Sequence, residues 1–134
     1  MSAPDIVVAT AARWVEKAEG DLVTARNNIQ AKTPGPTDST CFHAQQSAEK
    51  YLKAFLIQAG VDSPFTHNLA KLAELCAGID ASFRSLISVV ESLTPYAVEM
   101  RYDSEFWPDE EVARDARSRA LAVRDFVLRR LPGS

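Results

Sequence analysis

The sequence lacks any uninterrupted apolar run of about 18 residues, the length that a membrane-spanning helix needs. Its short apolar stretch at residues 6–9 has neither the length nor the basic start of a secretion signal. Strand-like alternation of apolar and polar residues is also missing. We therefore expect an all-α protein that acts in the cytoplasm and has no membrane contact.

Cysteine is scarce, and the two thiols are far apart. Cys41 and Cys76 form no Cys-x-x-Cys pair, and no histidine cluster that would close a metal site lies near them. A Gly-rich phosphate loop, a His-Glu-x-x-His helix and a nucleophile elbow are absent as well. We predict buried thiols, no metal, no cofactor and no catalytic residue from motifs.

Excess positive charge is lacking too, since the formal net charge is −3. A protein whose whole surface attracts nucleic acid needs a concentrated positive field, so RNA is a disfavoured partner. A local excess exists near the C-terminus, in Arg114, Arg117, Arg119, Arg124, Arg129 and Arg130. Arginine suits phosphate, but these six point in several directions and have no interleaved aromatics, so we favour salt bridges and solubility.

What the sequence has is helical periodicity. Residues 1–134 suit a single domain, and apolar residues spaced by three and four predict three long helices and about two short ones in an up-and-down bundle. The first long helix ends before residues 33–37, and the last runs from about Pro108, in its first turn, to Leu131. Thr66 and Asp80 are candidate caps of the short helices. Residues 96–107 show no regular pattern.

The central helix, 42–56, is preceded by the candidate caps Asp38, Ser39 and Thr40, and it has two faces. Its apolar stripe comprises Cys41, Gln45, Ala48, Leu52, Phe55 and Ala59. The amide in this stripe needs a hydrogen-bonding partner, because a buried unpaired amide costs about 1 to 3 kcal/mol. The bundle or a dimer contact is the favoured partner for Gln45, ahead of a ligand.

The opposite face of this helix is polar and contains His43, Gln46, Lys50 and Lys53, with Glu49 at its border. A solvated face with intrahelical pairs, Gln46 to Lys50 and Glu49 to Lys53, is the simpler interpretation. A surface that faces a ligand or a partner is the alternative.

Four segments resemble the HEPN domain family, named for its occurrence in higher eukaryotes and prokaryotes and for suspected nucleotide binding. They are residues 14–22 (WVEKAEGDL), 42–56 with its HAQQSAEK core, 66–69 (THNL) and 95–102 (PYAVEMRY). The second and third are the most specific, because their order and separation match the family as well as their residues. The resemblance spans nearly the whole chain.

This resemblance implies a helical bundle that pairs into a homodimer, often encoded beside a minimal nucleotidyltransferase as a two-component, toxin-antitoxin-like system. Many members resemble metal-independent ribonucleases in which an arginine and a histidine, with four to six residues between them, meet across the dimer. Here the positions that follow Arg101 at this spacing are Phe106, Trp107 and Pro108, and neither His43 nor His67 has an arginine at the matching distance before it. The chain therefore lacks the general acid or base of that site.

We expect a binding or regulatory module instead of an enzyme. Its predicted cleft for a nucleotide or a partner nucleotidyltransferase contains His43, Gln46, Glu49, Lys50, Lys53, Arg101 and Tyr102, with Gln45 as a dimer or bundle contact. Lysine and arginine would hold phosphates while the tyrosine stacks on a base. The alternatives are a ribonuclease toxin with a divergent site and an oligomerising scaffold.

Overall fold

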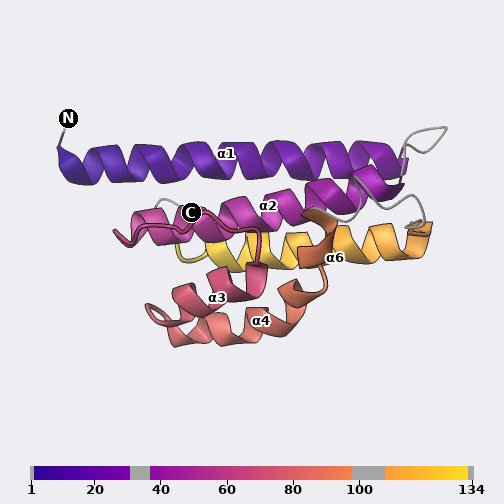
Figure 1. The fold of residues 1–134 in the computed structure, drawn as a ribbon. Coiled ribbons are helices and arrows are strands. Elements are labelled where there is room, and N and C mark those ends of the chain that lie inside the picture. Colours follow the sequence, from indigo (N-terminus) through magenta and orange to yellow (C-terminus); the bar gives the residue numbers. More distant parts are fainter. Residues whose placement is uncertain (1, 31–36, 98–107, 133–134) are drawn as a thin grey trace.

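The computed structural model describes residues 2–30, 37–97 and 108–132, which contain helices and no strand (Figure 1). The long helices are α1 (Ala3–Gln30), α2 (Thr37–Gln58) and α6 (Glu110–Leu128), and the short ones are α3 (Leu69–Ala77) and α4 (Arg84–Glu91). The all-α bundle of three long and two short helices is confirmed. No helix within the described ranges is both long enough and apolar enough to span a membrane.

The long helices do not simply alternate in direction. Helices α1 and α2 are antiparallel, as their short connection predicts, whereas α2 and α6 run the same way (Figure 1). The chain is carried back between them by residues 59–68, by α3 and α4, and by the 3₁₀ turns Ala81–Phe83 and Thr94–Ala97. Both short helices therefore lie on the side of α2 away from α1.

Helix α2 is the centre of the bundle and is buried on more than one stripe. Thirteen of its 22 residues are buried, among them Ala44 and Ala48, whose small side chains let neighbouring helices approach closely. The predicted solvated face is therefore wrong at Glu49 and Lys53, which are buried because α1, α6 and α3 pack around α2, whereas the other three residues of this face are half-buried. Ala59, predicted in the apolar stripe, lies beyond the end of the helix and is exposed.

Aromatic rings join the layers of the core. Phe83 lies 4.4 Å from Phe55 of α2 and 4.9 Å from Phe126 of α6, measured between ring centroids. Such pairs contribute about 0.5 to 1.5 kcal/mol each beyond their buried area. The guanidinium of Arg130 covers the outer face of Phe126 at 3.5 Å.

The helix ends are set by side-chain caps, not all of them the predicted ones. Asp80 caps the turn before α4, as predicted, and Asp109 caps α6 by accepting from the Val112 amide at 2.8 Å. The predicted Thr66 cap is wrong: Asn68 caps α3, and the Thr66 hydroxyl accepts from the Asn68 amide instead.

The last helix is shorter than predicted at both ends. Pro108 precedes the capping residue instead of lying in the first turn, and α6 ends at Leu128, three residues before the predicted Leu131. The predicted apolar spacing itself is confirmed, since Ala113, Ala116, Ala120, Val123 and Val127 are all buried.

Candidate functional site

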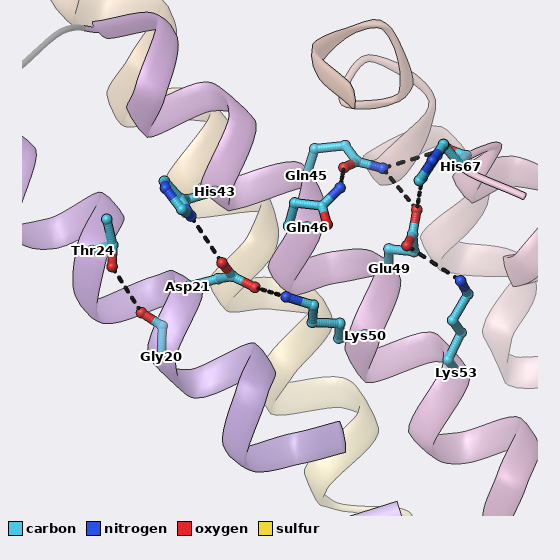
Figure 2. Close-up of polar contacts among 10 residues, drawn as sticks. All are labelled: Gly20, Asp21, Thr24, His43, Gln45, Gln46, Glu49, Lys50, Lys53 and His67. Atoms are coloured by element: carbon cyan, nitrogen blue, oxygen red, sulfur yellow. Dashed lines mark hydrogen bonds and ion pairs between the residues drawn. The ribbon is translucent and has the colours of Figure 1, made fainter. Parts of the chain in front are cut away.

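The predicted polar residues of α2 meet around two carboxylates, Asp21 of α1 and Glu49 of α2 (Figure 2). We call this group the α2 cluster; it comprises Asp21, His43, Gln45, Gln46, Glu49, Lys50, Lys53 and His67. It lies between α1, α2 and the segment that leads into α3.

Asp21 connects α1 to α2. Its Oδ1 lies 2.8 Å from Nδ1 of His43, and its Oδ2 accepts a hydrogen bond from Nζ of Lys50. Lys50 was predicted to pair with Gln46 along the helix, and this prediction is wrong because the α1 carboxylate packs against it. Asp21 itself was not predicted, although it borders the buried stripe positions Ala18 and Leu22.

Glu49 is buried, with 4% of its surface exposed, and is the centre of the part of the cluster next to α3. Its Oε1 lies 2.7 Å from Nδ1 of His67 and accepts from the Gln45 amide at 3.3 Å. Its Oε2 accepts from Nζ of Lys53 at 3.3 Å, so the predicted Glu49–Lys53 pair is present. Lys53 is only 8% exposed, which makes this an ion pair removed from water.

Gln45 is fully buried, and its hydrogen-bond partners lie in the same chain. The amide nitrogen donates to Glu49 and to the His67 carbonyl at 3.4 Å, while its oxygen accepts from the Gln46 amide at 2.6 Å. The stripe position is thus satisfied inside the bundle, and the same bonds attach the segment before α3 to α2.

An aromatic edge borders the cluster on its exposed side. Nζ of Lys53 lies 5.8 Å from the Trp14 ring and 6.0 Å from the Phe65 ring, and Phe65 is 96% exposed. His67 next to it is partly exposed, with its ring centroid 6.0 Å from that of Phe65. The sequence analysis did not identify Trp14 and Phe65 as site residues, because an isolated apolar residue is ordinarily interpreted as part of the hydrophobic core.

The remaining candidates contribute differently. Arg101 and Tyr102 lie outside the described residues. Cys41 and Cys76 are fully buried, as predicted, and burial raises the pKa of each thiol to about 12, so neither supplies a thiolate near neutral pH. In the part of the chain that the structure describes, no three potential metal ligands gather.

Four arginines of α6 and the turn after it form ion pairs, in agreement with the predicted salt bridges. Their shortest contacts are Arg114 to Glu110 at 2.7 Å, Arg119 to Asp115 at 2.8 Å, Arg124 to Glu19 at 2.8 Å and Arg130 to Asp80 at 3.2 Å. Arg117 and Arg129 have no ion pair among residues 2–30, 37–97 and 108–132.

Comparison with known proteins agrees with this architecture. The crystal structure of TT1696 from Thermus thermophilus is similar to this chain, with a TM-score of 0.76 and 26% sequence identity over 90% of this chain and 98% of that one. No curated protein sequence matches. The HEPN domain matches residues 11–131, nearly the whole chain. The protein therefore belongs to the HEPN domain family.

Proposed function

We propose that this protein is a non-catalytic HEPN module that acts in the cytoplasm by binding. It forms a homodimer, and the surface at the α2 cluster binds a nucleotide or a partner minimal nucleotidyltransferase of a two-component system. The observation that carries this proposal is the Phe65 ring, which stands 96% exposed beside the ordered polar groups of the cluster.

An exposed ring next to fixed hydrogen-bonding groups suits the recognition of a base. Phe65 offers a free aromatic face, and base stacking on such a face is worth about 1 to 3 kcal/mol in nucleic-acid binding. His67 presents a partly exposed polar edge beside it. Because Glu49 and Gln45 hold the segment before α3 on α2, these groups are positioned before a ligand arrives.

RNA cleavage is less well supported by the same geometry. His43 and His67 each bond to a carboxylate, Asp21 or Glu49, and no arginine precedes either at the family spacing. The two lysines of the cluster are neutralised by those carboxylates. These residues favour binding over phosphodiester chemistry.

A nucleotide titration followed by tryptophan fluorescence tests the proposal. Trp14 lies beside Lys53 and reports on the cluster. A Trp14→Phe variant leaves Trp107 as the only tryptophan, so comparing the two proteins separates the fluorescence signals of the two positions. We expect saturable quenching by a nucleotide, and about tenfold or more weaker binding in Phe65→Ala. Ile79→Ala is the matched control, since Ile79 is also exposed but lies elsewhere. No response at millimolar nucleotide, or equal binding by Phe65→Ala, would contradict nucleotide binding.

Two further measurements test the rest of the proposal. Light scattering on the purified chain should give twice the mass of one chain, and a monomer at micromolar concentration would exclude the homodimer. Incubation with cellular RNA should leave it intact. Cleavage that is lost in Arg101→Ala would replace the binding function with the ribonuclease alternative.

A further inference from the structure

A polar pocket lies between α1 and α6 and shares no lining residue with the α2 cluster. It has a volume of about 170 Å³, and its polar lining comes from Arg26 and Gln30 on α1 and from Arg114, Arg117 and Ser118 on α6. Three arginines thus line one small pocket in a chain whose net charge is −3.

Arg117 differs from the paired arginines of its helix. Its Nε is buried and has no hydrogen-bond partner among the residues that the structure describes. Burial lowers the pKa of its guanidinium, and the nearby charge of Arg26 lowers this pKa further. A partly buried cation beside a like charge is unfavourable unless an anion compensates it.

The neighbouring charges compensate this pocket only in part. Glu110 pairs with Arg114 at 2.7 Å, which leaves Arg26 and Arg117 without a carboxylate partner in the described ranges. This incomplete pairing favours an anion in the pocket.

We propose that this pocket binds the phosphate group of a small phosphorylated ligand. The planar, permanently charged guanidinium of arginine matches phosphate oxygens, and Gln30 and Ser118 add neutral donors. Among the residues that the structure describes, the lining has no aromatic side chain on which successive bases of RNA would stack. A compact phosphate ester therefore suits the pocket better than a nucleic-acid strand.

Calorimetric titration with inorganic phosphate at low ionic strength tests this proposal. We expect saturable binding by the wild-type chain, and binding weakened by about tenfold or more in Arg117→Gln and by several-fold in Arg26→Gln. Arg129→Gln is the matched control, because Arg129 is exposed just after the same helix, has no ion pair in the described part of the chain and is absent from the pocket lining. It should bind phosphate as the wild type does.

The outcomes separate the proposal from its rivals. Arg26 is exposed, so Arg26→Gln keeps the test valid even if Arg117→Gln folds poorly. No phosphate binding by the wild-type chain, or unchanged binding in Arg26→Gln, would overturn the proposal. Binding of a short single-stranded RNA that depends on Arg26 and is not displaced by phosphate would also overturn the proposal. Phe65→Ala should leave phosphate binding intact, which distinguishes this pocket from the proposed nucleotide surface.

Discussion

The α2 cluster and the pocket between α1 and α6 are both polar, but they differ in how their positive charges are paired. In the α2 cluster Lys50 pairs with Asp21, and Lys53 pairs with Glu49. In the α1–α6 pocket Arg26 and Arg117 face each other's charge without such a partner among the described residues. Within the described residues, the lysines of the α2 cluster are each paired with a carboxylate, whereas the arginines of the pocket are only partly paired.

This difference indicates which charged groups stabilise the fold and which are available to bind an anion. Buried ions that are fully paired fix the arrangement of the helices that bring them together. Removing one partner leaves the other charge buried and uncompensated, which lowers stability. Unpaired cations near a surface hollow gain most from an external anion. We therefore expect changes in the α2 cluster to reduce stability and changes in the pocket to alter binding.

Glu49→Gln should have the largest effect on stability. The substitution leaves the Lys53 ammonium, which is 8% exposed, without its counter-charge, and the expected loss in the free energy of unfolding is about 3 kcal/mol or more. Urea denaturation measures it. The double variant Glu49→Gln/Lys53→Met should recover much of the loss, and Glu110→Gln, in an exposed pair, should cost less than about 0.5 kcal/mol. Equal losses in the free energy of unfolding for Glu49→Gln and Glu110→Gln would refute the distinction between the buried and the exposed ion pair.

Asp21→Asn should cost less, about 1 to 3 kcal/mol. Its partners His43 and Lys50 retain some exposure, so water can replace part of what the carboxylate supplies. Glu16→Gln on the same helix is the control, since Glu16 is exposed and has no ion pair in the described ranges. Urea denaturation measures both variants. Equal midpoints for Asp21→Asn and Glu16→Gln would show that the α1 end of the cluster contributes nothing to stability.

The two buried thiols of the core predict a pH dependence of stability. Burial raises the pKa of Cys41 and Cys76 from 9.0 to about 12, so the folded chain keeps protons that the unfolded chain loses. The free energy of unfolding should therefore fall as pH rises above about 9, by roughly 1 kcal/mol per thiol at pH 10. Thermal melts across pH 8 to 10.5 measure the slope, which should be shallower in Cys41→Ala. A flat profile would contradict the burial of both thiols.

Arg117→Met should have the smallest effect, and in the opposite direction. In the absence of an anion it removes a buried unpaired donor and the repulsion with Arg26 while keeping an aliphatic stem. We expect stability to be unchanged or to rise by up to about 1 kcal/mol, and added phosphate to raise the melting temperature of the wild type alone. A clear loss of stability would make Arg117 a structural residue like those of the α2 cluster.

Much of the helical fold could be predicted because its causes are local. Apolar spacing and proline or glycine breaks depend on residues within a few positions of each other. The same holds for the Glu49–Lys53 pair, whose members are four residues apart on one helix. The Thr66 prediction failed within the same short range, because Asn68 offered a competing cap two residues later.

The candidate site was less predictable because its contacts are not local. His43 and Asp21 are 22 residues apart, and His67 reaches Glu49 across 18 residues, so no spacing rule relates them. The helix pattern alone makes the polar face of α2 look solvated. Only the packing of α1 and the segment before α3 buries Glu49 and turns the face into an ion-paired network.

By itself the sequence determined where helices form, that no strand pattern competes with them, and which family the chain resembles, since those properties belong to short segments and their order. Tertiary structure alone decided that Lys50 bonds to Asp21 instead of Gln46. It also decided that Phe65 is exposed to solvent and that Arg26 and Arg117 line the same pocket. The physical reason is that charge pairing and burial depend on distance in space, and helices that are far apart in the chain set that distance only when they pack.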